Sequence, residues 1–486
     1  MYTFGELRNK YRTFEFTGFE SEFTDDMLEV RYFYNIPGLR EFRTRWVFPA
    51  QRKVMTNVLH ELLFSLGMAE AISYYKCVCP KTVIVSCGIL DADQIHWWEK
   101  LFYKGLGEFQ YRNGIDVTQE ELLHIECTHG DELISGSGEL YGVKGSHDAD
   151  IELSTGSYTL PLHDDNAYDG IMVPIGGGKD SVVSLELLRD RAVYTYSINE
   201  SDTIRNVIGC CDHVKQDLTA RRILDKGILE MNNMGYLNGH IPFSSVVAFS
   251  TVITSYLNGI KYIVLSNEAS ANESTVAGSF VNHQYSKSFE FESDFDSYIK
   301  KLTDSDIHYF SLLRPYAEIR IAALFARMPR YHSAFRSCNA GSKQGIWCCS
   351  CPKCLFVYII LSPFLTEDEL IEIFGEKLTD KDSLDKDFRE LTGIDENKPF
   401  ECVGTRSEVC AAVKRFVKGG RPFSGTGMLP PRRSLLTDRY SDYIDGLRDD
   451  LDELIGEISE EHNIPDELLY TIERSSEIIG GKDPRA

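Results

Sequence analysis

The sequence has no long apolar run. Across its 486 residues, no uninterrupted apolar stretch approaches the ~20 residues that a membrane-spanning helix requires, so we expect no membrane span. The first residues, Met1 to Glu6, also lack the basic and apolar segments of a secretory signal, so we expect a cytoplasmic protein.

Positive charge is scarce as well. There are 51 Lys and Arg against 74 Asp and Glu, which gives a formal net charge of -23 at pH 7. A protein that binds DNA or RNA needs a basic face to neutralise phosphates, so we expect no nucleic-acid partner. The rest of the composition, 43% hydrophobic and 26% charged, is ordinary for a globular protein, and the length allows two or three domains.

The cysteines do not suit a disulfide framework. Their count, 13, is odd, and without a secretory signal we expect reduced thiols, some of them on a metal. Cys338, Cys348, Cys351 and Cys354 have the spacing of a metal site, with two adjoining C-x2-C steps, and Cys349 is an extra thiol. Four thiolates suit a structural Zn²⁺ ion, and an iron–sulfur cluster is the alternative.

The clearest chemistry lies in three glycines, 176–178, followed by Lys179, Asp180 and Ser181, between an apolar run and a helical pattern. Contiguous glycines let the backbone approach a ligand, and the N-terminus of the following helix favours an anion. A Walker A loop would place Ser or Thr directly after the lysine, whereas Asp180 stands there. We interpret the stretch as a phosphate-binding loop, with an ordinary glycine turn as the alternative.

A second polar stretch, Ser266 to Glu273, follows an apolar run at 261–265 that is typical of a buried strand. Because the carboxyl ends of parallel strands meet at one edge of a sheet, Asn267 and Glu268 are expected near the glycine loop. Asp180, with Glu268 or Glu273, is the predicted Mg²⁺ ligand set. A polar loop of turn-forming Asn and Ser is the alternative.

The pattern along the chain predicts an α/β protein in three parts. Residues 1–165 read as an aromatic-rich α+β domain, with alternating strands over 12–50. From 166 to 417 strands alternate with helices, including one expected over 221–231, which implies a parallel sheet. Residues 418–486 read as a linker and an acidic helical tail.

Together these stretches resemble known families. The glycine loop is similar to the PP-loop of ATP pyrophosphatases, usually Ser-Gly-Gly-X-Asp-Ser, with Gly176 in place of the first Ser. The motifs, in order along roughly residues 10–415, resemble the MurL family, the UDP-N-acetylmuramoyl-L-alanyl-L-glutamate epimerases of peptidoglycan synthesis. The further segments that carry this resemblance are Ser73–Lys76, Gly105–Gly114, Leu237–Pro242, Asn282–Ser288 and Lys398–Gly404.

The resemblance implies an ATP-dependent epimerase whose substrate is the nucleotide-linked muramoyl dipeptide ending in L-Glu. ATP would adenylate the terminal carboxylate, the adjacent Cα–H would become more acidic, and hydrolysis would release the D-Glu product, AMP and pyrophosphate. The residues expected to hold ATP are Gly176, Gly177, Gly178, Lys179, Asp180, Ser181, Asn267 and Glu268. The candidates for catalysis are Lys179 and Asp180 at the phosphates and Cys402, His240 and His283 as acid/base groups.

Arg314 or Lys287 could bind a substrate carboxylate or phosphate. A homo-oligomer is possible. Two other functions suit part of the sequence. An amidating ligase resembling 7-cyano-7-deazaguanine synthase would share the glycine loop and the zinc cysteines. A non-catalytic ATP-binding zinc protein would explain Gly176 in place of Ser.

Overall fold

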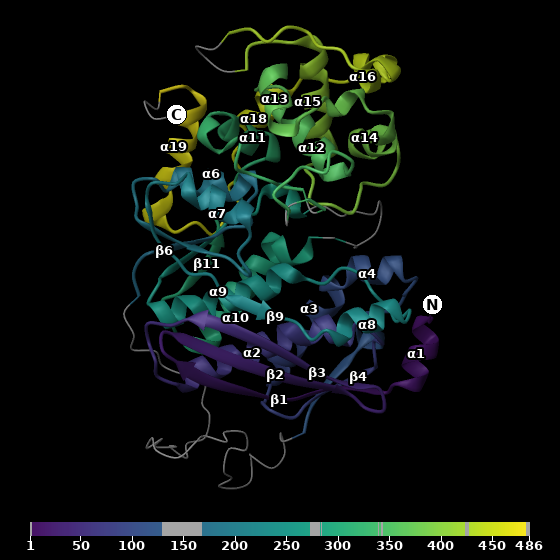
Figure 1. Cartoon of the computed structure of the whole chain (residues 1–486), viewed down its shortest axis with the longest axis vertical. Coiled ribbons are helices and arrows are strands. Elements are labelled where there is room, and N and C mark those ends of the chain that lie inside the picture. The colour runs from purple at the N-terminus through teal and green to yellow at the C-terminus, as the bar shows by residue number, and fades with distance from the viewer. Residues whose placement is uncertain are drawn as a thin grey trace. The chain divides into compact units, whose positions relative to one another are not determined.

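The computed structural model describes residues 2–128, 168–272, 282, 284–338, 340–341, 344–422 and 427–482. The chain forms two compact units, whose elements are labelled in Figure 1. Unit 1 comprises residues 1–169, 218–261 and 295–307, and unit 2 comprises residues 170–217, 262–294 and 308–486. No helix in the described ranges is both long enough and apolar enough to cross a membrane.

Unit 1 is built on a mixed six-stranded sheet in the order β5-β4-β1-β2-β3-β9. The antiparallel meander confirms the alternating pattern over 12–50, and one of its faces is buried. The helix α2 (Asn57–Tyr75) packs on that face, where the hydroxyls of Tyr32 and Tyr34 donate to the carbonyls of Leu63 and Gly67 at 2.9 and 2.8 Å. The strands are β1 (Thr13–Thr24), β2 (Met27–Ile36), β3 (Arg40–Pro49), β4 (Thr82–Val85), β5 (His124–Cys127) and β9 (Arg221–Ile223).

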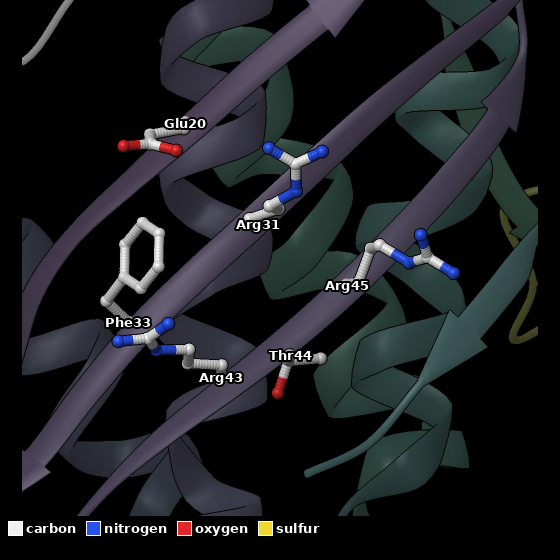
Figure 2. Close-up of a pocket in the computed structure, with 6 residues that line it drawn as sticks. All are labelled: Glu20, Arg31, Phe33, Arg43, Thr44 and Arg45. Atoms are coloured by element: carbon white, nitrogen blue, oxygen red, sulfur yellow. The ribbon is translucent and has the colours of Figure 1, made fainter. Parts of the chain in front are cut away.

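The opposite face of the meander carries a shallow hollow, shown in Figure 2. It is lined by Glu20, Arg31, Phe33, Arg43, Thr44 and Arg45. Arg31 and Arg45 stand directly opposite each other on β2 and β3, an unfavourable pairing of like charges. Glu29 lies 2.5 Å from Arg31 and 3.5 Å from Arg45 and reduces their repulsion, but the three arginines of the hollow outnumber its one lining carboxylate, Glu20.

The remaining helices of unit 1 include α9 (Phe243–Asn258), which packs against α2. Its side chains are buried on nearly every side, as its apolar sequence predicts. The sequence places a helix over 221–231, but residues 221–223 pair with β3 as β9, and the helix α8 begins only at Gly227. The other helices are α1 (Phe4–Lys10), α3 (Ala92–Gly105), α4 (Gly107–Arg112), α5 (Gln119–Leu122) and α8 (Gly227–Asn233).

Unit 2 contains a five-stranded, wholly parallel sheet in the order β11-β10-β6-β7-β8. The first strand of this sheet, β6, lies in its middle. Strands β7 and β8 are added on one side of it, and β10 and β11 on the other. Strand order therefore reverses between β6 and β10, and ligands of such sheets bind at the carboxyl ends beside that reversal. The strands are β6 (Ile171–Pro174), β7 (Val193–Tyr196), β8 (Val214–Asp217), β10 (Tyr262–Leu265) and β11 (His308–Ser311).

A helical layer completes unit 2 and shares one apolar core with the sheet. The C-terminal segment after 427 belongs to this core, since Leu436, Ile444, Leu451 and Ile478 are buried in it. The helices are α6 (Lys179–Leu187), α7 (Asp202–Gly209), α10 (Phe289–Thr303, shared with unit 1), α11 (Glu318–Ala326), α12 (Pro352–Leu361), α13 (Glu367–Phe374), α14 (Asp385–Thr392), α15 (Arg406–Lys418), α16 (Leu435–Arg439), α17 (Ser441–Asp445), α18 (Leu451–Gly456) and α19 (Tyr470–Ile479).

These units differ from the three parts drawn from the sequence. Residues 218–261, expected in the parallel-sheet domain, fold with unit 1, and the tail after 427 is an integral part of unit 2 rather than an appendage. Both differences have the same cause. The hydrophobic periodicity of the sequence shows that a helix has an apolar face, but it does not show which unit that face packs against.

Candidate functional site

The glycine loop leaves β6 and enters α6, as the sequence predicts. Gly177 has a φ of +84°, and a Cβ on it would lie 2.7 Å from Cγ2 of Thr203, so only glycine suits this position. Gly178 is the N-cap of α6, and no capping side chain bonds to the backbone N–H groups of the first helical turn. Those N–H groups are therefore open to a ligand. The loop is held from behind, because the amide of Arg336 donates to the carbonyl of Gly177 at 2.8 Å.

Lys179 lies buried at the start of α6 between two carboxylates. Its ammonium contacts Asp180 and donates to Oε1 of Glu318 at 2.7 Å. Burial opposes its charge, but Asp180 and Glu318 outweigh burial and raise the pKa of Lys179. Burial also works against the charge of Asp180, yet the lysines Lys179, Lys353 and Lys287 lower its pKa on balance.

Glu318 is the first residue of α11, the helix that follows β11 after a short segment, and it is almost wholly buried. Burial raises the pKa of Glu318 to about 8 despite the attraction of Lys179, and the negative charges of Asp180 and Glu268 add to the effect. One ammonium group therefore does not compensate both of its carboxylates. Among the described residues the buried Oε2 atom of Glu318 has no hydrogen-bond partner, so it is an acceptor that a bound cation would satisfy.

The stretch after β10 lies at the same edge of the sheet. Ser266 joins it to α6 through a 2.7 Å hydroxyl contact with Ser184, and Glu268 is buried and accepts from Ser270 at 3.2 Å. The amide group of Asn267 donates to Ser311 on β11 at 3.0 Å, so in this state it ties two strands together. Ser181, the other predicted loop residue, donates to the carbonyl of Gly178 at 3.1 Å.

Two lysines flank Cys402 in unit 2. The ammonium of Lys287 lies 3.3 Å from its Sγ atom, and Lys353 contacts its carbonyl oxygen. The electrostatic attraction to a Cys402 thiolate is the main cause that raises the pKa of Lys287, with Glu268 and Asp180 adding to it against the opposing effect of burial. An adjacent ammonium favours the thiolate form of a cysteine, so this environment suits a reactive thiol.

Arg314 is fully buried and does not face the site as a free anion receptor. It pairs with Glu292 at 2.9 Å and donates to the carbonyls of Glu268 and Lys287 at 2.8 and 2.6 Å. The charge of Arg314 is thus paired within unit 2, and its hydrogen bonds hold the segments of Glu268 and Lys287 in place.

The four predicted cysteines come together. The Sγ atoms of Cys338, Cys348, Cys351 and Cys354 all lie within 4.8 Å of one another, close enough to share a single metal ion. Cys349 turns away, with a φ of +52° and its thiol donating to the carbonyl of Phe374 at 3.2 Å. The donor set and the distances fit a four-thiolate site and leave Cys349 outside it.

The remaining sequence candidates are His240, His283 and Glu273. His240 belongs to unit 1, where its Nδ1 atom lies 3.8 Å from Glu108. His283 and Glu273 lie outside the described residues, so their predicted roles stay predictions. Glu318 was not among the sequence candidates. It stands in the segment that follows a strand of the parallel sheet, as Glu268 does, but seven residues beyond the end of β11 rather than three.

The fold and site define an α/β protein with a parallel sheet whose polar and charged residues gather where the strand order reverses. The chain belongs to the MurL family: the family's MurL N-terminal domain matches residues 6–312, and its MurL C-terminal domain matches residues 332–421. The C-terminal match thus contains the cysteine cluster and Cys402.

Three relatives are each named UDP-N-acetyl-alpha-D-muramoyl-L-alanyl-L-glutamate epimerase. The protein from Xanthomonas oryzae pv. oryzae is 32% identical over 392 residues, which cover 75% of this chain and 80% of the relative. Those from Salinispora tropica and a Micromonospora species are also 32% identical, over 75% of this chain and 74% and 76% of their own lengths. No solved structure matches the chain.

Proposed function

We propose that this protein is an ATP-consuming epimerase that converts the terminal L-Glu of UDP-N-acetylmuramoyl-L-Ala-L-Glu to D-Glu in peptidoglycan precursor synthesis. The proposal rests on the family and on the names of the three relatives. The observation that carries its chemistry is the glycine loop at the reversal of the sheet, with three carboxylates and a lysine-flanked thiol in the same unit.

In this proposal the loop is a PP-loop that binds the phosphates of ATP. The backbone N–H groups at the start of α6 and the ammonium of Lys179 would bind the phosphates. Asp180, Glu268 and Glu318, with the predicted Glu273, would hold Mg²⁺, which would offset phosphate charge. The unpartnered oxygen of Glu318 supports this donor set.

The reaction would begin when a carboxylate oxygen of the terminal glutamate attacks the α-phosphorus of ATP and displaces pyrophosphate. The resulting acyl adenylate withdraws electrons from the carbonyl carbon, so the neighbouring Cα–H becomes more acidic. Removal of that proton and its return to the opposite face invert the carbon. Water then displaces AMP and releases the product.

Cys402 is the first candidate for one of the two proton-transferring groups. Its thiol lies beside Lys287, whose ammonium favours the thiolate that would accept a proton. His240 and His283 remain the other candidates. The four-cysteine cluster would hold Zn²⁺ as a structural ion that joins the segment 338–348 to the start of α12.

The decisive experiment incubates the full chain with UDP-N-acetylmuramoyl-L-Ala-L-Glu, ATP and Mg²⁺ in heavy water. We expect AMP, pyrophosphate, D-Glu and one deuterium at Cα of the product. A Cys402→Ala variant should still release pyrophosphate but should incorporate deuterium at least about tenfold more slowly, since only the proton-transfer step loses its group.

The same assay separates the alternatives. AMP release that requires ammonia or an amine, without inversion, would show an amidating ligase. Bound ATP without any pyrophosphate would show a non-catalytic nucleotide-binding protein. Either result would overturn the epimerase proposal.

A further inference from the structure

Three segments of unit 1, one of which contains the candidate His240, meet at one place. They are the end of α2 with Lys76, the helix α4 with the residues that follow it, and the loop 237–242 before α9. The ammonium of Lys76 donates to Oδ1 of Asn238 at 2.9 Å and to the carbonyl of Gly239 at 2.6 Å. The side chain of Asn113 donates to the carbonyl of Asn238 at 3.1 Å.

The contact is close-packed as well as hydrogen-bonded. A Cβ on Gly239 would lie 3.2 Å from the ring of Phe109 on α4, and one on Gly105 would lie 2.6 Å from Pro242. Glycine at these two places lets the loop 237–242 lie directly on the α3–α4 corner. These segments are far apart in the sequence, so their meeting is a built feature of the unit rather than a local turn.

Lys76 is the unusual member of this group. It is only 8% exposed, yet both hydrogen-bond partners of its ammonium are neutral oxygens, and no carboxylate of the described residues pairs with it. Burial lowers the pKa of Lys76, which expresses the cost of holding this charge out of water. An ammonium has three N–H donors, and two of them are used here.

Nearby negative charges do not neutralise the buried ammonium of Lys76. Glu108 is the carboxylate that α4 brings to the group, and it accepts from Arg112 at 2.5 Å and lies 3.8 Å from His240. Its negative charge is therefore taken up by Arg112. The side chains of His240 and Arg112 are 33% and 53% exposed, so a solute can reach the edge of the group where His240 follows Gly239.

We propose that Lys76, together with His240 and Arg112, forms an anion-binding site on unit 1 that takes a phosphate or carboxylate group of the substrate. The ammonium of Lys76 supplies its third N–H, and the two outer side chains supply further donors. A charge-assisted bond to a bound anion would compensate the buried lysine, which its neutral partners do not. This inference rests on the proposed function, whose substrate carries both kinds of anion.

A lysine that only clamps the loop 237–242 would give the same hydrogen bonds, so the test must measure a ligand. We would titrate the full chain, without ATP, with UDP and separately with L-Ala-L-Glu, and follow binding by calorimetry. The variant is Lys76→Met, and the matched control is Lys81→Met, an exposed lysine of the same unit.

We expect one probe to bind about tenfold more weakly to Lys76→Met, the loss of one charge-assisted hydrogen bond, and equally well to Lys81→Met. A loss confined to UDP identifies the phosphates as the anion, and a loss confined to the dipeptide identifies its carboxylates. A folded Lys76→Met protein that binds both probes like the wild type would overturn the proposal, as would a wild type that binds neither.

If Lys76→Met does not fold, Arg112→Gln decides by the same criterion, because this half-exposed side chain can be changed without opening the core. Binding of these probes needs no turnover. A chain that binds UDP or the dipeptide through Lys76 but fails to release AMP would refute the proposed function and leave the anion site standing.

Discussion

The contact between Cys402 and Lys287 can be tested by measuring how fast the Cys402 thiol reacts. The ammonium 3.3 Å from Sγ favours the thiolate, and the thiolate is the form that reacts with alkylating agents. In Lys287→Met we expect Cys402 to react with iodoacetamide at least about fivefold more slowly near neutral pH, as followed by peptide mass spectrometry. The exposed Lys386 offers the control, and an equal rate in Lys287→Met and Lys386→Met would refute the pairing.

The raised pKa of Glu318 should make the free energy of unfolding fall as pH rises. Its folded pKa is about 8, against the ordinary value of 4.5, so the folded chain keeps a proton that the unfolded chain releases. The stability from this group is fully present below about pH 4.5 and is lost as pH rises to about 8. Between these values the free energy of unfolding should fall more steeply in the wild type than in Glu318→Gln.

Urea unfolding at several pH values across that window checks this expectation. The control is Glu457→Gln, since Glu457 is exposed on the same unit and should leave the slope of the wild type unchanged. Parallel curves for the wild type and Glu318→Gln would show that Glu318 is charged throughout.

At the scale of elements, the glycine loop offers a comparison between neighbouring residues. Gly177 needs positive φ and has Thr203 against it, whereas a Cβ on Gly176 would meet nothing within 4 Å. Gly177→Ala should lower the free energy of unfolding by about 1–3 kcal/mol and abolish measurable ATP binding, whereas Gly176→Ala should leave the free energy of unfolding unchanged and weaken ATP binding less. Equal ATP affinities in the two variants, measured by calorimetry, would contradict the loop assignment.

The cysteine cluster gives a second comparison of neighbours. Cys351→Ser should remove the bound metal and lower Tm by about 5 °C or more, because metal binding stabilises the folded site. Cys349→Ser should keep the metal, since its thiol lies on the carbonyl of Phe374. Metal analysis of both purified proteins, with calorimetry before and after a chelator, tests this; loss of metal in both variants equally would show that Cys349 is a ligand.

These two elements were also the most predictable from sequence. In both, the residues lie within a short stretch, so chain geometry helps to bring the groups together: contiguous glycines before a helix, and Cys348, Cys351 and Cys354 each separated by two residues, with Cys338 ten positions before them. The strands over 12–50 were equally clear because alternation reports one buried face. The helix expected over 221–231 was not, because the pairing of residues 221–223 with β3 depends on a distant strand.

At the scale of the whole molecule, the C-terminal segment is part of the core. Arg320 on α11 is nearly buried and donates to the carbonyl of Ile455 at 2.6 Å and to the hydroxyl of Ser475 at 2.9 Å. A chain ending at Arg421 would leave this guanidinium buried without those partners and would uncover the apolar faces of α11 and α6.

We therefore expect the truncated chain to lack the cooperative thermal transition of the full chain and to aggregate on purification. Differential scanning calorimetry and gel filtration of the two proteins provide the measurement. A monodisperse truncated protein with an unchanged Tm would show that the segment is an appendage, as its sequence alone had indicated.

The sequence by itself determined the glycine loop, the cysteine cluster, the presence of a parallel sheet and the resemblance to the MurL family. Each depends on residues close together along the chain or on a fixed order of motifs. Tertiary structure alone decided that Glu318 meets Lys179 across 139 residues and that Lys287 meets Cys402 across 115. It also decided that α9 packs in unit 1 and that the tail packs in unit 2. The reason is physical: local spacing is limited by backbone geometry, whereas distant partners are chosen by which apolar surfaces bury one another.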